Sequence, residues 1–240
     1  METATDNTTF FDRIHTILNR VTDVTGVEWR VLMALFLIAG GIWLTATVAE
    51  EVLEGDTHTI DTMILLSLRE QDDKSDPIGP VWFEEIVRDL TALGGTALLT
   101  LTVSAVGGYL LMLKRYRKLA VLLSAVLGAF LLSYFLKDIF DRPRPELVAG
   151  GTRVFSASFP SGHSLLAAAT YLTLGGLVAQ IHTRWRLRMF TILLAILIVL
   201  VVGVSRVYLG VHWPSDVLAG WTLGAIWALV CWMGGYWIND

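Results

Sequence analysis

Long uninterrupted apolar runs dominate the pattern of hydrophobic and polar positions along this chain. A run of about 20 apolar residues spans the hydrocarbon core of a bilayer when it folds as an α-helix. The fifth run along the chain is shorter than the others, so its helix is expected to include residues that flank it. The six runs lie at residues 31–48, 93–113, 119–136, 164–181, 189–204 and 217–237. This pattern predicts an all-α polytopic membrane protein with six transmembrane helices.

The segment between the first two runs has a different, acidic pattern. Residues 50–92 hold twelve acidic residues and only three basic ones. Within them, residues 60–68 and 81–90 place apolar side chains on one helical face, which predicts two amphipathic helices. Asp89 or Thr91 is expected to cap the second span. Two interpretations of this loop stay open: a lid over the outer face, or a solvated acidic loop without a catalytic role.

The first 28 residues form an N-terminal segment that is polar and acidic at its start, which is unlike a secretory signal peptide. Apolar residues then recur at helical spacing, with arginines on the other face, which indicates an amphipathic helix in the membrane interface. A partly ordered tail is the alternative. The apolar positions are Phe10, Ile14, Ile17, Val21 and Val24.

Basic residues in the short loops predict the orientation of the spans. Residues 114–118 and 184–188 are rich in lysine and arginine, and such loops lie on the cytoplasmic side. The N-terminal segment, with Arg13, Arg20 and Arg30, joins them there. Both termini are then cytoplasmic in a plasma or inner membrane, and the 50–92 loop lies outside. The loops between spans three and four and between spans five and six also lie outside.

Composition agrees with a membrane protein and excludes other classes. The chain has 240 residues, of which 54% are hydrophobic, and its mean hydropathy is +0.60. These values are too apolar for an ordinary soluble domain, so we expect a single membrane domain over residues 1–240. The single cysteine, Cys231, rules out a disulfide framework. The sequence has no basic cluster with interleaved aromatic residues, so no nucleic acid partner is expected.

Polar residues interrupt the apolar pattern most sharply in residues 205–216. Pro214 is tolerated only in the first turn of a helix, so a new helix is predicted to begin near it. His212 would lie at the mouth of that helix and Asp216 in its first turn, where a carboxylate can orient an imidazole and stabilise its cation. Arg206 offers a planar fork that suits a phosphate. The alternative is a polar loop with a capping aspartate and a snorkelling arginine.

Two further polar stretches lie between spans three and four. Lys137 ends the third span and Arg144 follows it in a proline-rich segment, although a snorkelling lysine would also explain the first of these. Ser161 is a natural N-cap for the fourth span, followed by Gly162 and His163. The free N–H groups of a helix N-terminus bind phosphate, and glycine permits close approach to the backbone. A simple cap beside an interfacial histidine is the alternative here.

The predicted topology brings these three stretches to the same outer face, where such a cluster is typical of a phosphoryl-transfer site. The order Lys-x6-Arg-Pro, Pro-Ser-Gly-His and Ser-Arg-x5-His-x3-Asp resembles the type-2 phosphatidic acid phosphatase superfamily, in its bacterial membrane-bound branch. The resemblance covers residues 137–216 directly. It places the catalytic core at residues 119–237, and no motif of the family is found before the third span.

The resemblance implies a role for each motif residue. His212 would be the nucleophile, oriented by Asp216, and His163 would be the general acid and base. Arg142 is not a motif position and is assigned only to the entrance of the site. The phosphate would be bound by Lys137, Arg144, Ser161, Gly162 and Arg206.

The resemblance also implies a reaction without a metal or cofactor, through a phosphohistidine. Its substrates would be membrane lipids with a phosphate or diphosphate, such as phosphatidic acid, phosphatidylglycerol phosphate, undecaprenyl diphosphate or lipid A. No obligatory protein partner is implied. Two alternatives from other classes are a vanadium haloperoxidase-like enzyme, which shares this site chemistry, and a non-enzymatic lipid transporter, which would need ionisable residues near mid-span.

Overall fold

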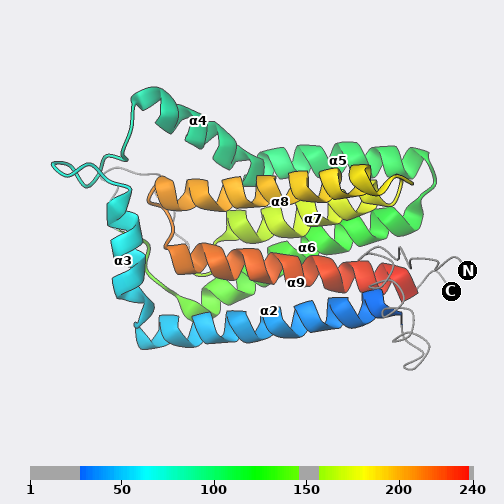
Figure 1. Cartoon of the computed structure of the whole chain (residues 1–240), viewed down its shortest axis with the longest axis horizontal. Helices are drawn as coiled ribbons and strands as arrows, with labels where there is room; N and C mark the ends of the chain where they lie inside the picture. The colour runs from blue at the N-terminus through cyan, green and yellow to red at the C-terminus, as the bar shows by residue number, and fades with distance from the viewer. Residues whose placement is uncertain (1–27, 146–156, 238–240) are drawn as a thin grey trace, which may run out of the picture.

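The computed structural model describes residues 28–145 and 157–237, and these residues fold into helices joined by short loops (Figure 1). The amphipathic helix predicted within residues 10–24 lies outside the described residues. A short 3-10 helix, η1, covers Ala92–Gly94. The α-helices are α2 (Trp29–Glu54), α3 (Thr57–Ser67), α4 (Val81–Thr91), α5 (Thr96–Met112), α6 (Tyr116–Phe140), α7 (Gly162–Ala179), α8 (Trp185–Tyr208) and α9 (Pro214–Trp237).

The predicted spans are present as helices. Helices α2, α6, α7, α8 and α9 are each long and apolar enough to cross a membrane. The second span is α5, whose 17 residues extend about 26 Å at about 1.5 Å per residue. It joins α4 through η1 at a bend of 49°. Taken together, the bent pair is long and apolar enough to form a sixth span. The all-α, polytopic prediction is therefore confirmed, although the second span starts later than predicted because Gly95 is extended.

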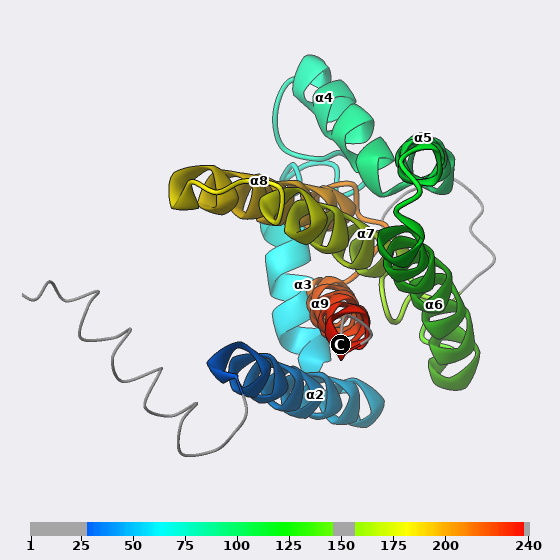
Figure 2. The same ribbon diagram turned by 90° about the vertical axis from the view of Figure 1, so that its right-hand side faces the viewer.

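Helix α7 lies at the centre of the bundle, between α6, α8 and α9 (Figure 2). Two glycines of α9 allow it to approach α7 closely. A β-carbon at Gly220 would lie 2.7 Å from the Ser161 carbonyl oxygen, and one at Gly224 would collide with the Leu165 carbonyl. Only glycine permits this contact, which sets the first turns of α7 and α9 side by side. The Ser161 N–H then donates to the Asp216 main-chain oxygen at 3.0 Å.

The acidic loop packs on the end of the bundle instead of extending into solvent. Both predicted helices are confirmed as α3 and α4, and α3 crosses the bundle end while α4 lies along α8 (Figure 1). The side chain of Leu65 is 1% exposed and packs with Val207 and Val217. The predicted cap is wrong: Gly95 is the N-cap of α5, and the Thr91 hydroxyl accepts a hydrogen bond from Arg206 instead.

Candidate active site

The three polar stretches predicted to converge do so at one end of the bundle. Lys137 lies in the last turn of α6, Arg206 in the last turn of α8 and Asp216 in the first turn of α9. A β-carbon at Gly162 would lie 3.9 Å from Lys137 Nζ, so the start of α7 faces that lysine. Residues from the other two stretches lie close enough to His163 to act on it electrostatically. They are Arg206, His212, Lys137 and Arg144.

Two helix starts position the reactive groups, as the sequence predicted. Ser161 is the N-cap of α7, and its hydroxyl accepts hydrogen bonds from the Ser164 N–H at 3.5 Å and the Ser164 hydroxyl at 3.0 Å. At the start of α9, the Asp216 carboxylate reaches back to the Trp213 N–H at 2.9 Å. This bond from the backbone of Trp213 holds the Asp216 carboxylate within one turn of His212.

The imidazole of His212 is 1% exposed and has different partners on its two nitrogens. Its Nε2 lies 3.1 Å from Arg144 Nη1. Because a guanidinium can only donate hydrogen bonds, Nε2 is the unprotonated nitrogen and Nδ1 carries the proton. Nδ1 faces Asp216 Oδ2 at 3.4 Å and Ser158 Oγ at 3.3 Å. The site therefore presents the Nε2 lone pair of a neutral imidazole toward a cationic side chain.

Burial controls the protonation of this histidine. Desolvation lowers the pKa of His212 to about 4, and the hydrogen bond and charge of Asp216 oppose that shift. Burial also lowers the pKa of Arg144 from its ordinary value, with Asp216 acting in the opposite direction. An arginine stays protonated in proteins, so at neutral pH a charged guanidinium faces a neutral imidazole.

Arg142 belongs to the interior of the site, so the prediction that it lies at the entrance is wrong. Its side chain is 11% exposed, and Nη1 donates to Asp216 Oδ1 at 2.6 Å and to Ser215 Oγ at 2.8 Å. Its Nη2 donates to Asp61 Oδ2 at 2.8 Å and to Thr57 Oγ1 at 3.2 Å. The guanidinium fork thus links the carboxylate behind the histidine to helix α3.

Sequence reasoning missed three residues that contact the motif residues or the side chains beside them. Asp61 is 2% exposed and accepts from the Ser215 N–H at 2.9 Å as well as from Arg142. Ser158 is fully buried and donates to the Asp216 carboxylate. Thr91 accepts from Arg206 at 3.2 Å. None of the three belongs to one of the motifs. Ser158 alone could have been found from the sequence, because it begins the Ser-Phe-Pro-Ser-Gly-His stretch.

The remaining predicted residues supply donors. Within the described part of the chain, the buried Nε of Arg206 has no hydrogen-bond partner, although a buried N–H normally has one. An oxyanion would satisfy it. Across the same described residues, no group of three or more His, Cys, Asp or Glu is placed to hold a metal ion. The positive charges that act on His163 include the side chains of Arg206, Lys137 and Arg144.

Comparisons with known proteins agree with the fold and with the family resemblance. The family model described as PAP2 superfamily matches residues 118–240. Phosphatidylglycerophosphatase B of Bacillus subtilis is 35% identical over 149 residues, which cover 60% of this chain and 71% of that protein. Undecaprenyl-diphosphatase of Sulfolobus acidocaldarius is 34% identical over 122 residues, which cover 48% of this chain and 55% of that protein.

A solved structure extends the similarity beyond the region that the family model covers. The crystal structure of a transmembrane PAP2 type phosphatidylglycerolphosphate phosphatase from Bacillus subtilis matches with a TM-score of 0.69 and 25% identity. The match covers 85% of this chain and 96% of that chain. The chain therefore belongs to the PAP2 superfamily and is a multi-pass membrane phosphatase.

Proposed function

We propose that this protein removes the terminal phosphate of a lipid phosphate or lipid diphosphate through a phosphohistidine formed on His212. One observation carries the proposal most directly. The Nε2 lone pair of His212 faces the cation of Arg144 at 3.1 Å, and the opposite nitrogen faces the Asp216 carboxylate. A buried nucleophile held between an anion-binding cation and an orienting carboxylate suits attack on a phosphorus atom.

In the first step, Nε2 forms a bond to phosphorus while the bond from phosphorus to the leaving oxygen breaks. The imidazole becomes cationic, and Asp216 stabilises that cation through the Nδ1 proton. His163 donates a proton to the leaving oxygen as the lipid departs. In the second step, His163 takes a proton from water, the water oxygen bonds to phosphorus and the bond from Nε2 to phosphorus breaks. Inorganic phosphate leaves and both histidines return to their starting forms.

The donors around the nucleophile bind the phosphoryl oxygens in this scheme. Arg144 would turn from Nε2 to a phosphoryl oxygen when substrate binds, which exposes the lone pair for attack. Arg206 would offer its unpartnered Nε, and the Gly162 N–H and Lys137, which lies beside Gly162, would offer further donors. Because Ser161 accepts two hydrogen bonds through its oxygen, its own O–H is available to donate. These donors match the spread charge of a loose transition state.

A reaction that depends on these side chains does not need a metal ion. We expect full activity in excess EDTA, and inhibition by vanadate, which takes the five-coordinate geometry of phosphorus in the transition state. Loss of activity in EDTA with recovery on adding Mg²⁺ would contradict this part of the proposal. The charges of the site lie at helix ends, as a surface enzyme requires, whereas a transporter binds its substrate near mid-span.

The site lies at one end of the membrane helices, where a headgroup can reach it while acyl or prenyl chains stay in the bilayer. The relatives named above act on phosphatidylglycerol phosphate and on undecaprenyl diphosphate. We therefore propose a lipid substrate of this class. From the bias of basic residues toward the other end, we infer that this end lies outside the cell. A cysteine at exposed Lys74 should react with an impermeant thiol reagent in intact cells, and one at Lys118 should not; the reverse pattern would invert the topology.

The decisive experiment measures phosphate release from a panel of lipid monophosphates and diphosphates. His212→Ala should lose essentially all turnover, because no other group accepts the phosphoryl. Asp216→Asn should lose less, since it leaves the nucleophile in place and weakens only its orientation and charge support. Near-normal turnover in His212→Ala would refute the assigned nucleophile. Absence of phosphate release from every lipid of the panel by the wild-type protein would refute the proposed function.

A further inference from the structure

A second binding feature lies at the end of the bundle opposite the active site. A cavity of about 600 Å³ there is lined by basic residues, and none of its described lining residues is acidic. A second cavity, of about 560 Å³, continues from it between α2, α7, α8 and α9 and is lined mainly by apolar side chains. The two share lining residues on α2, α6, α7 and α9, so they form one groove. The shared residues are Arg30, Val121, Leu177, Gln180 and Trp232.

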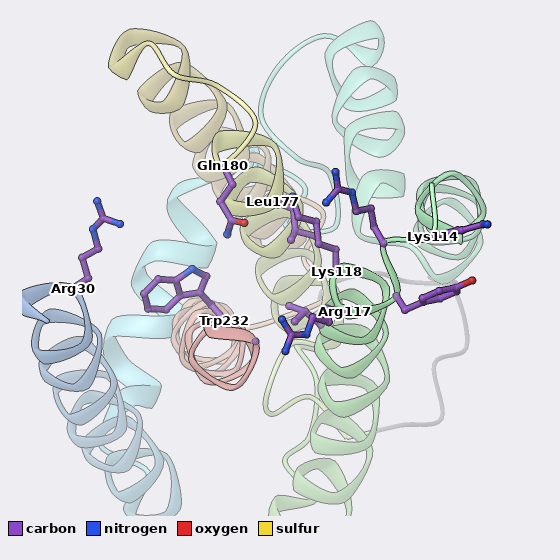
Figure 3. Close-up of a pocket in the computed structure, with 11 residues that line it drawn as sticks. Arg30, Lys114, Arg117, Lys118, Leu177, Gln180 and Trp232 are labelled. Carbon is purple, nitrogen blue, oxygen red and sulfur yellow. The ribbon is translucent and has the colours of Figure 1, made fainter. Parts of the chain in front are cut away.

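The position of the groove along the helices suits a membrane lipid. Its rim is at the first turn of α6, and the active-site Lys137 is in the last turn of the same helix. About 20 helical residues separate them, or about 30 Å, which is the thickness of the hydrocarbon core. Figure 3 shows Arg30 of α2 on one side of the groove and Arg117 and Lys118 of α6 on the other, with Leu177 and Trp232 between them. The rim thus lies at one membrane surface and the apolar part beneath it.

The arrangement of charge exceeds what topology requires. The bias of basic residues toward the cytoplasmic side accounts for their presence in short loops. This bias does not account for five basic residues around one apolar groove. Arg184, Arg186 and Arg188 lie at the same end of the bundle, before and within the first turn of α8, yet they line neither cavity. The rim residues are Arg30, Lys114, Arg115, Arg117 and Lys118.

We propose that this groove binds one anionic phospholipid, with its headgroup phosphate at the basic rim and an acyl chain in the apolar part. Arginine and lysine recognise phosphate by charge-assisted hydrogen bonds. A free anion would leave the apolar part empty, and a zwitterionic headgroup would bring its own cation against the rim. Room for a chain is visible at Gly176, where an added β-carbon would meet no atom within 4 Å. This regulatory or stabilising site is distinct from the catalytic one and does not depend on the proposed reaction.

The test is thermal unfolding of the purified full-length protein in detergent with added lipid. Phosphatidylglycerol, an anionic phosphodiester, is compared with phosphatidylcholine of the same acyl chains and with inorganic phosphate. At a concentration of roughly a hundred times Kd, we expect phosphatidylglycerol to raise Tm by about 5 °C, and the other two to have little effect. Equal shifts with both lipids, or the same shift with inorganic phosphate, would overturn the proposal.

Two variants of the groove make the test specific. Arg30→Gln/Lys118→Gln removes rim charge, and its matched control, Arg184→Gln/Arg186→Gln, removes equal charge from the same end outside the groove. Gly176→Leu fills the apolar part, and its control is Gly108→Leu, another helical glycine with open space at its β-carbon. Both glycine variants gain helix propensity, so loss of the lipid response cannot be a simple loss of stability.

We expect the lipid-induced shift to fall below about 1 °C in both groove variants and to persist in both controls. A shift retained in either groove variant would overturn the proposal, as would its loss in both controls. Phosphatase activity measured on the same preparations separates this result from the proposed function. Failure of the wild-type protein to release phosphate would leave the Tm comparison unaffected.

Discussion

Asp61 and Arg142 form a buried ion pair at 2.8 Å although they are 81 positions apart in the chain. The same guanidinium contacts Asp216 at 2.6 Å on its other nitrogen. A carboxylate from the acidic loop thus shares one cation with the carboxylate that faces His212 Nδ1. Helix α3 is held to the catalytic helix α9 through this pair and through the Ser215 contacts of Asp61. Helix α3 of this loop is therefore attached to the candidate active site through buried polar contacts.

The first prediction concerns this pair. Asp61→Asn keeps the shape of the side chain but removes its charge. Among the described residues, Asp216 would then be the only carboxylate partner of Arg142. Because the positive charge of Arg142 would act on Asp216 alone, Asp216 would stabilise the His212 cation less. We expect kcat to fall about tenfold with KM little changed, as for other groups that orient a reactive residue indirectly. Steady-state kinetics on the preferred lipid phosphate would measure both constants.

A matched control and a double variant separate positioning from a general loss of structure. Asp72→Asn removes an exposed charge from the same loop and should leave both constants unchanged. Asp61→Asn/Arg142→Gln should be no slower than Arg142→Gln alone, because Asp61 acts through Arg142. Additive losses in the double variant would show that Asp61 serves the fold independently of Arg142.

The sequence predicted the parts of the site that local patterns control. The helix start at Pro214 sets His212 and Asp216 one turn apart, and Ser161 caps its own helix, so spacing alone indicated both. The Asp61–Arg142 and Thr91–Arg206 contacts join residues 81 and 115 positions apart. Nothing local distinguishes Asp61 from the other eleven acids of its loop. Its burial depends on how α3 packs against α9, which periodicity does not specify.

The second prediction is a pH dependence. Attack requires neutral His212, and burial lowers the pKa of its imidazole to about 4. A lowered pKa keeps the reactive form present as the pH falls below the ordinary value of about 6.5. The acid limb of the kcat/KM profile reports ionisations of the free enzyme and of the free substrate, and the second pKa of the substrate phosphate is about 6. After correction for the substrate, we expect the limb that belongs to the enzyme to lie below about pH 5.

The anion of Asp216 raises the pKa of His212. Asp216→Asn should therefore move that acid limb to still lower pH while it reduces the rate. A limb that stays near pH 6.5 in the corrected wild-type profile, or that moves upward in Asp216→Asn, would contradict the assignment. Profiles of kcat/KM between about pH 4 and 8 for the two proteins decide the question.

The third prediction tests the contact between η1, at the bend of the second span, and helix α7, which carries His163. A β-carbon at Gly94 would collide with Val202 Cγ1 at 2.5 Å, and it would lie 3.1 Å from the His163 carbonyl oxygen and 3.2 Å from the His163 β-carbon. Gly94→Ala should therefore displace His163 and lower the free energy of unfolding by about 1–3 kcal/mol, as overpacking does. We expect kcat to fall as well. Gly108→Ala, where the added carbon meets no atom within 4 Å, should lower neither the free energy of unfolding nor kcat.

The last prediction uses His163 to ask which bond this enzyme is suited to break. A lipid monophosphate leaves as an alkoxide, whose conjugate acid has a pKa near that of water, about 15.7. A lipid diphosphate leaves as a phosphate, whose second pKa is about 6. The alkoxide needs a proton in the transition state and the phosphate hardly needs one, and general acid catalysis supplies about 10²–10⁴-fold. His163→Ala should therefore lose at least about tenfold more rate on phosphatidic acid than on a prenyl diphosphate.

Single-turnover formation of the phosphohistidine is the measurement that isolates this step, because attack by water in the second step also uses His163 and would hide the difference. Thr170, fully buried on the same helix away from the helix start, offers a control in Thr170→Val, which should slow both substrates equally if it slows either. Equal losses on the two substrates in His163→Ala would mean that His163 binds the phosphate without donating a proton to the leaving group. The proton would then have to come from another donor, and Lys137, beside the Gly162 backbone, is the group that the geometry offers for that role.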